Sequence, residues 1–430
     1  MELKKITDLF TSLHEKYDGV YKEAMQVLMV STEYPPMPGG VGRYTSNLTN
    51  ELRKAGLDVY VVCNEKGDGQ YSGISPKNPH NSDVLLKIVN DLKPDIVHVQ
   101  FEPGLYGLIL DPFDPKKSGT YIDAFYTKCI IPIVTTFHTG YSLSQWISQA
   151  SLIKKSGRIG KLGIPARALV RFWKYFLNYQ AFNNLNKEKL RMSAAGVVFS
   201  HYMSERLENG TNDAGSNGGK CHVIYHGSEP AVHPPLNKKE AREKFSLPQE
   251  QEYRIALAHG FRTATKGWDI LGKMKMPDGW ILVVNSSKGY YSTENLDLKW
   301  EKGNNILDLQ RGFLSEEDLS ILFYASDVII LPYKVTAGSG VMFDALAHGL
   351  PFVATDLKFF REFASQGLGI TVKRNPHAFS RGIKKLDRNY FKYAETVDLF
   401  KQNLKWNVVA RQHSQLYYSI VNTRRDLKAE

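Results

Sequence analysis

The sequence predicts an α/β protein of two domains, each a doubly wound parallel sheet. Short apolar runs rich in Val and Ile recur along the chain without alternating with polar residues, which is typical of strands buried on both faces. Segments long enough for helices separate these runs, and alternating strands and helices favour parallel sheets. A length of 430 residues is compatible with two or three domains.

The predicted strands fall into two series. They are residues 27–30, 59–63, 96–99, 131–135 and 196–199, then 255–258, 281–284, 328–331, 352–354 and 370–372. Between the series lie a Gly- and Asn-rich segment at 209–219, a short apolar run at 222–225 and a Pro-rich segment. We therefore expect one domain over residues 1–225 and a second over 226–400. A helical pattern in 401–430 predicts a final helix that crosses back to the first domain.

The bulk composition is that of a globular protein, with 42% hydrophobic and 23% charged residues. Three cysteines, an odd and sparse set, do not form a disulfide framework and indicate a reducing compartment. The N-terminal residues do not read as a signal peptide, and no run reaches the roughly 18 apolar residues of a membrane helix. We therefore expect a cytoplasmic location, in solution or on the cytoplasmic face of a membrane.

The net charge of +11 is unevenly distributed. Between residues 150 and 178 basic residues occur without any acid. They are Lys154, Lys155, Arg158, Lys161, Arg167, Arg171 and Lys174. The segment 164–179 has a basic face and an apolar face with aromatics, a pattern that fits an anionic membrane surface and equally a domain helix with a solvated basic face. A soluble anionic molecule that acts as an acceptor substrate would be a further partner for this charge. No nucleic-acid-binding module is recognisable, so no nucleic acid is expected as a partner.

Two motifs of the first half lie where predicted strands end. A Pro- and Gly-rich turn at 35–42 precedes an amphipathic helix expected over 43–55. Glycines let backbone N–H groups approach an anion at a helix N-terminus, although a tight turn needs the same residues. His138 follows the strand 131–135, and ligands of parallel sheets bind beyond the carboxyl ends of strands. It is therefore placed to bond a sugar hydroxyl, with a structural role as the alternative.

Two further motifs follow strands of the second half. The loop 259–267 places Arg262 and Lys266 beside glycines, which suits a diphosphate as well as a plain solvated loop. The apolar run 268–271 after it predicts the start of a helix. The segment 336–355 is a small-residue loop that opens a helix, and a helix N-terminus favours phosphate. Asp344 lies within that helix and suits the hydroxyl groups of a ribose.

In this order and spacing, the four motifs resemble family 4 of the retaining glycosyltransferases. The resemblance runs over residues 26–421 and includes the landmarks at 94–98, 194–200, 313–319 and 325–332. It implies the GT-B fold, in which two Rossmann-like domains face each other across a cleft. The first domain would then receive the acceptor and the second would bind the nucleotide sugar.

The resemblance also implies roles for individual residues. Gly39, Gly40 and Val41 would approach the donor phosphates and the transferred sugar. His138 would contact this sugar at the reaction centre, and Arg262 and Lys266 would neutralise the departing diphosphate; these three form the predicted catalytic set. The remaining donor-binding residues would hold the sugar, phosphate, ribose and base. They are Phe313, Leu314, Thr336, Gly338, Ser339, Gly340, Val341 and Asp344.

Several positions depart from the family pattern. Thr336 occupies the place of the first Glu in the family's Glu-x7-Glu element, and Asp344 is shorter than the second Glu. Phe261 intervenes between the Gly and the Arg of the phosphate motif, and the turn at 284–287 lacks glycine. His226 stands where Asn is common at the domain hinge. These departures motivate an alternative interpretation, a catalytically decayed GT-B protein that binds nucleotide sugars without transferring them.

The implied reaction is retaining transfer of a hexose-type sugar from a UDP- or GDP-sugar to an acceptor, which is a lipid-linked glycan if the basic segment binds a membrane. The departing phosphate would take the acceptor proton, so that catalysis rests on positioning and on charge stabilisation. No metal or other cofactor is expected, because basic residues supply the positive charge. A phosphorylase or a sugar-nucleotide epimerase of the same fold accounts less well for the element at 338–344.

Overall fold

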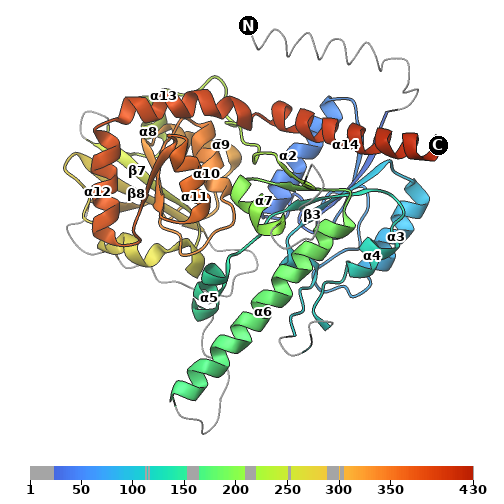
Figure 1. The fold of residues 1–430 in the computed structure, drawn as a ribbon. Coiled ribbons are helices and arrows are strands. Elements are labelled where there is room, and N and C mark those ends of the chain that lie inside the picture. Colours follow the sequence, from blue (N-terminus) through green and yellow to red (C-terminus); the bar gives the residue numbers. More distant parts are fainter. Residues whose placement is uncertain are drawn as a thin grey trace.

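The computed structural model describes residues 24–111, 114, 117–152, 164–208, 219–249, 253–287, 300 and 305–429, without the side chains of 149–171 and 427–429. It contains two six-stranded parallel sheets with helices packed on them (Figure 1). The predicted fold class is therefore confirmed. Within the described residues, no helix is long and apolar enough to span a membrane.

The first sheet has the strand order β2-β1-β3-β4-β5-β6. Its strands are β1 (Gln26–Val30), β2 (Asp58–Val62), β3 (Ile96–Phe101), β4 (Ile133–Phe137), β5 (Ala195–Val198) and β6 (Cys221–Val223). The helices of this half are α2 (Gly40–Lys54), α3 (Asn81–Leu92), η1 (Pro103–Tyr106), α4 (Asp123–Lys128), α5 (Leu143–Leu152), α6 (Ile164–Met192) and α7 (His201–Glu208). The residues of β1, β3, β4 and β5 are almost wholly buried, which explains their unbroken apolar sequence.

The second sheet has the order β12-β11-β10-β7-β8-β9. Its strands are β7 (Arg254–Phe261), β8 (Trp280–Ser287), β9 (Ile306–Asp308), β10 (Val328–Leu331), β11 (Phe352–Thr355) and β12 (Gly369–Val372). The helices of this half are α8 (Lys238–Lys244), η3 (Ala264–Lys266), η4 (Trp268–Lys273), α9 (Glu316–Tyr324), α10 (Gly340–Ala347), α11 (Lys358–Ser365), α12 (Pro376–Asp387), α13 (Tyr390–Phe400) and η5 (Lys401–Leu404).

Two local expectations are wrong in detail. The run after Gly267 forms the short 3-10 helix η4 and not the start of an α-helix. The helix expected from residue 43 begins earlier, at Gly40, with Gly39 as its cap. Both differences occur at glycines. Glycine adds nothing to the hydrophobic periodicity, so the sequence pattern does not show whether it belongs to a loop or to a helix.

The last helix, α14 (Trp406–Ala429), leaves the second domain and lies along α2 of the first (Figure 1). The hydroxyl of Tyr417 on α14 lies 2.6 Å from Nδ1 of His98 on β3. Both side chains are fully buried, so this helix is part of the core of the first domain.

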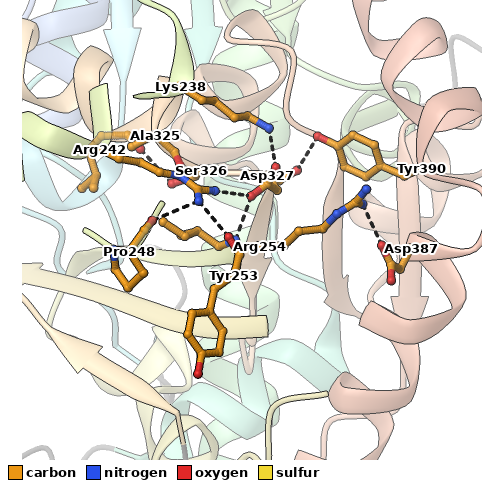
Figure 2. A network of polar contacts seen from close by, with 12 residues as sticks. Lys238, Arg242, Pro248, Tyr253, Arg254, Ala325, Ser326, Asp327, Asp387 and Tyr390 are labelled. Carbon is orange, nitrogen blue, oxygen red and sulfur yellow. Dashed lines mark hydrogen bonds and ion pairs between the residues drawn. The ribbon is translucent and has the colours of Figure 1, made fainter. Parts of the chain in front are cut away.

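A buried ionic cluster joins the elements of the second domain (Figure 2). Arg242 on α8 is fully buried and its Nη2 lies 2.9 Å from Oδ2 of Asp327. Asp327 also accepts the Ile255 backbone N–H at 2.8 Å and pairs with Lys238. The remaining Arg242 donors bond to backbone carbonyls at Ala325, Pro248 and Tyr253. The cluster therefore holds α8 to the amino ends of β7 and β10.

We predict that Asp327→Ala lowers the free energy of unfolding by about 3–5 kcal/mol, because it leaves a buried guanidinium without its counter-charge. Urea unfolding measures the change. Asp356→Ala is the control, because the Asp356–Arg361 pair is largely exposed and should be worth about 0–1 kcal/mol. Equal, small effects of the two substitutions would contradict the role given to the cluster.

Candidate active site

His138 follows β4 directly and sits in an aromatic shell. Its backbone N–H donates to the Phe101 carbonyl at 3.0 Å. Its ring meets those of Tyr44 and Phe199 edge-on, with centroids 5.4 and 5.3 Å away. Burial, with a further contribution from His226, lowers the pKa of His138 to about 3. The imidazole is therefore neutral at physiological pH, fit to form hydrogen bonds but not to carry charge.

The glycine turn at the start of α2 holds a carboxylate of the protein itself. Glu33, which follows β1, is buried, and burial raises its pKa while the backbone N–H groups of Gly42 and Val41 lower it. A Cβ placed on Gly39 would lie 2.2 Å from Oε2 of Glu33, so any larger residue there would displace this carboxylate. The donor contact predicted for Gly39, Gly40 and Val41 stays a prediction, and Glu33 is an anionic neighbour that the motif did not reveal.

Lys266 lies close to the N-terminus of α10. Its Nζ is 3.9 Å from the centroid of the Tyr333 ring, and the Tyr333 hydroxyl is 3.2 Å from Oγ of Ser339. Ser339 caps α10 by accepting the backbone N–H of Met342. The ammonium group, the Tyr333 ring and the helix N-terminus are thus linked through direct contacts, as an anion site requires.

Arg262 is oriented by a residue of the neighbouring strand. Its Nε donates to Oγ of Ser286 at 2.7 Å, and its backbone N–H donates to the Ser287 carbonyl. Ser286 lies in β8, within the segment 284–287 that departs from the family pattern by lacking a glycine-rich turn. Arg262, which Phe261 separates from the glycine of its motif, therefore has its partner in this unusual segment.

The loop before α10 faces the first domain. A Cβ on Gly338 would lie 3.9 Å from the Phe199 ring, and one on Gly340 would lie 3.6 Å from Nε2 of His226. Val341 faces Gly260 of the phosphate motif, at 4.0 Å from a Cβ placed there. Phe199 also contacts His138, so the predicted residues of the two domains converge on one region.

Thr336, in the place of a glutamate, is buried and makes a local contact. Its hydroxyl donates to the Gly338 carbonyl. The Thr336 carbonyl accepts a hydrogen bond from Nε2 of Gln145, at 2.7 Å, across the domain interface. The Thr336 hydroxyl thus shapes the loop, and the Thr336 carbonyl joins the loop to the first domain.

Asp344 is engaged in an ion pair between the domains. Its Oδ2 lies 2.9 Å from Nη1 of Arg43 on α2, and the Ser228 hydroxyl donates to Oδ1. Arg43 also contacts Oε1 of Glu316 at 2.8 Å. Burial alone would raise the pKa of Asp344, but Arg43, His226 and Ser228 together hold it below its usual range. The ribose contact of Asp344 stays a prediction, and any ribose there would meet a carboxylate that Arg43 already pairs.

The segment predicted to meet the base carries an exposed ring. Phe313 is 65% exposed and its ring lies parallel to that of Phe261, with centroids 6.5 Å apart. Asn285 holds the preceding turn by donating to the Gly312 carbonyl at 2.9 Å. Leu314 packs against the core, so the backbone at 313–314 is anchored on one side and open on the other.

The sequence analysis did not predict several residues of this region. Arg43, Gln145 and Glu316 meet their partners only through the domain interface, so no local motif marks them. Glu33 and Gln100 do carry a signal, because each is a polar residue at or just beyond the carboxyl end of a buried strand.

Among the described residues, no group of three or more His, Cys, Asp or Glu side chains could hold a metal ion. A groove of about 580 Å³ lies at the amino ends of β4 to β6, beside α14, and is lined by Ile130, Arg191, Lys220 and Arg424 among others. It contains none of the predicted site residues and lies at the opposite edge of the sheet from His138.

Fold and site together define a two-domain α/β protein in which a capped helix N-terminus lies at the domain interface. Two family models match the chain, Glycosyltransferase Family 4 over residues 38–231 and Glycosyl transferases group 1 over residues 293–389. The chain therefore belongs to the glycosyltransferases that these models describe. No curated protein matches its sequence.

Solved structures share the fold at low sequence identity. Sucrose-phosphate synthase from Thermosynechococcus elongatus is 14% identical over 93% of this chain and 100% of its own, with a TM-score of 0.65. A glycosyltransferase from Rickettsia africae is 18% identical over 93% and 99%, with a TM-score of 0.61. HepE from Anabaena, solved with UDP-glucose, is 13% identical over 92% and 100%, with a TM-score of 0.60. These likenesses establish the GT-B fold.

Buried neutral histidines make the protein acid-sensitive. Burial lowers the pKa of seven histidines: His138 to about 3, His226, His259, His348 and His413 to about 4, His98 well below its usual range, and His222 below its usual value. The unfolded chain takes up protons near pH 6.5, where the folded protein does not. Stability rises with pH wherever the unfolded state binds more protons. Glu33, Glu102 and Glu316, whose pKa burial raises, act in the opposite direction.

We therefore predict that the free energy of unfolding falls as the pH drops from about 6.5 to about 4, each histidine contributing up to about 1.4 kcal/mol per pH unit. Urea titrations at a series of pH values measure it. His348→Asn should flatten the curve, whereas the exposed His80→Asn should leave it unchanged. A stability that is constant over this range would refute the prediction.

Proposed function

We propose that this protein is a retaining, metal-independent glycosyltransferase that moves a hexose-type sugar from a UDP- or GDP-sugar to an acceptor. Membership of the glycosyltransferase families supports the transfer. Crystal structures of HepE with UDP-glucose and with UDP support a uridine donor by analogy of fold. The anion-binding features at the start of α10 support a diphosphate leaving group.

The convergence of Lys266 with the cap of α10 carries this proposal. A diphosphate that departs from the sugar gains negative charge in the transition state. Lys266, the N–H groups that follow Ser339 and the guanidinium of Arg262 supply fixed positive partners for it. Because these groups are held by Tyr333 and Ser286, little reorganisation is needed as the charge grows.

Retention would follow from attack on the same face from which the diphosphate leaves. The departing phosphate oxygen takes the proton of the acceptor hydroxyl as the new glycosidic bond forms. His138, neutral and next to the loop at 336–340, would hold a hydroxyl of the transferred sugar. Positioning and charge stabilisation then provide the catalysis.

We expect Lys266→Ala to reduce turnover at least 100-fold, since removal of one donor from such a site costs about 2.7–4 kcal/mol. Initial rates with UDP- and GDP-sugars measure the loss. Lys273→Ala is the matched control, because it removes the same charge from an exposed position at the end of η4. A Lys266→Ala protein with nearly normal turnover would refute the assignment.

Thermal stabilisation by UDP, GDP, ADP and their sugars identifies the base and tests the alternative. Ligand at a hundredfold over its dissociation constant should add about 2.7 kcal/mol. Stabilisation by one nucleotide that is lost in Lys266→Ala supports the donor site. Binding of a nucleotide sugar without transfer to any acceptor, in particular to lipid extracts, would favour the catalytically decayed protein.

We propose that the protein works in the cytoplasm and reaches a lipid-linked acceptor by binding an anionic membrane surface through α6. Phe172 and Trp173 on this helix are 45% and 52% exposed, although both are large and apolar. The Phe172 ring stacks with that of Phe176, the Trp173 ring meets Phe176 edge-on, and Lys174 beside them is exposed. Exposed aromatics next to basic residues suit a lipid interface. Lys154, Lys155, Arg158 and Lys161 lie outside the described residues, as do the side chains of Arg167 and Arg171.

We predict that Phe172→Ser with Trp173→Ser lowers binding to phosphatidylserine-containing vesicles about tenfold or more, because each buried aromatic is worth about 1.5–3 kcal/mol. Co-sedimentation with these vesicles and with neutral phosphatidylcholine vesicles measures it. Phe391→Ser, which removes an 83% exposed ring from α13, should have no effect. Failure of the wild-type protein to prefer anionic vesicles would contradict the membrane proposal.

A further inference from the structure

We propose that Gln100 is a positioning residue for His138: it fixes the imidazole as the tautomer protonated on Nε2 and leaves Nδ1 as a hydrogen-bond acceptor for a hydroxyl of the transferred sugar. The inference rests on the proposed function for the identity of the ligand. The tautomer itself follows from contacts within the first domain.

The orientation of the Gln100 amide is set by its surroundings. Gln100, on β3, is fully buried. Its Nε2 lies 3.2 Å from Sδ of Met29 and 3.4 Å from Nε2 of His98, and its Oε1 lies 3.0 Å from Nε2 of His138. A thioether can only accept a hydrogen bond, so the NH2 group faces it and the carbonyl oxygen faces His138. Since a carbonyl oxygen cannot donate, the proton between Gln100 and His138 belongs to Nε2 of His138.

The contacts on the far side of Gln100 agree with this assignment. Burial holds the pKa of His98 well below its usual range, so His98 is neutral and carries one proton. If the Thr136 hydroxyl donates to Nε2 of His98, at 2.7 Å, it uses the single lone pair of this nitrogen, and the Gln100 amide 3.4 Å away is only a weak second donor. The proton then sits on Nδ1, which donates to the Tyr417 oxygen at 2.6 Å. This assignment is compatible with a Gln100 amide group that points to Met29 and a carbonyl oxygen that points to His138.

The remaining nitrogen of His138 is available to a ligand. Nδ1 makes no hydrogen bond to another residue in the part of the chain that the structure describes, and it is not enclosed. The ring lies against Phe199, which faces Gly338 of the predicted sugar-binding loop. A neutral imidazole with its proton on Nε2 presents a lone pair at Nδ1. The matching ligand group is therefore a hydroxyl that donates.

Without the Gln100 carbonyl, His138 is free to change tautomer and to turn. For histidines that bind metals, loss of the residue that orients the ring typically costs about 10–100-fold in activity, and we take this as the scale for an orienting partner. We expect a loss of this size in kcat/KM for Gln100→Leu, carried mainly by kcat. His138→Asn should lose as much, and the double variant should lose no more than either single one, because Gln100 acts only through His138.

The first experiment is nitrogen-15 NMR of the histidine-labelled, full-length protein, with the His138 signals assigned by His138→Asn. The wild type should show the tautomer protonated on Nε2. Gln100→Leu should give a mixture, and Gln100→Glu, which keeps an acceptor oxygen, should restore the wild-type tautomer. Tyr106→Phe is the matched control, because it removes buried hydrogen bonds to the carbonyls of Gln100 and Val30 without touching His138.

A wild-type His138 protonated on Nδ1, or a tautomer unchanged in Gln100→Leu, would overturn the proposal. The second experiment compares a donor sugar with its analogue in which the contacted hydroxyl is replaced by fluorine, which cannot donate. The analogue should lose rate with the wild type but not with Gln100→Leu, and equal losses in both would also overturn it. Absence of any transfer by the wild type would instead count against the proposed function, while the NMR result would still decide the role of Gln100.

Discussion

The aromatic packing around Tyr44 holds the two domains in register. This side chain is fully buried on α2 and contacts the rings of four residues. They are His138 directly after β4, Phe199 directly after β5, His226 at the crossing between the domains and Trp406 at the start of α14. A Cβ on Gly227 would lie 2.4 Å from the Trp406 ring, so only glycine fits where the chain crosses. Because His138 and the Gly338 loop both border this cluster, its packing sets the distance between the groups proposed to bind the sugar and the phosphates.

The architecture was predictable because strands buried on both faces have a distinctive sequence. Every apolar run that predicted a strand overlaps one, although the runs 59–63, 131–135 and 196–199 extend one or two residues beyond theirs. The short edge strands were harder to foresee: β9 has three half-buried residues, and an edge strand need not be apolar on both faces. The 3-10 helix after Gly267 reflects a crowded site, since a Cβ there would lie 1.8 Å from the Pro332 carbonyl. No local pattern reports a contact between two strands that are distant in sequence.

For the candidate site, the sequence indicated the loops but not the partners that hold them. Motifs identified Arg262, Lys266, His138 and the segment before α10, because loops beyond parallel strands are a recurrent place for ligands. The sequence did not show that Ser286 orients Arg262, because the two positions looked like separate departures from the family pattern. In the structure, the pairing of β7 with β8 brings Ser286 within hydrogen-bond distance of Arg262. Gln100 carried a signal as a polar residue near the end of a buried strand, but its contact with His138, just beyond another strand, could not be foreseen.

The bond between Arg43 and Asp344 joins residues 301 positions apart and has a consequence for how this sequence can diverge. An unpaired carboxylate at the buried position of Asp344 is costly, so a lineage that loses Arg43 must also neutralise residue 344 or supply another cation. Glu316, which is far more exposed, is under no such constraint. Positions 43 and 344 should therefore vary together among descendants of this chain, whereas position 316 should vary independently of them.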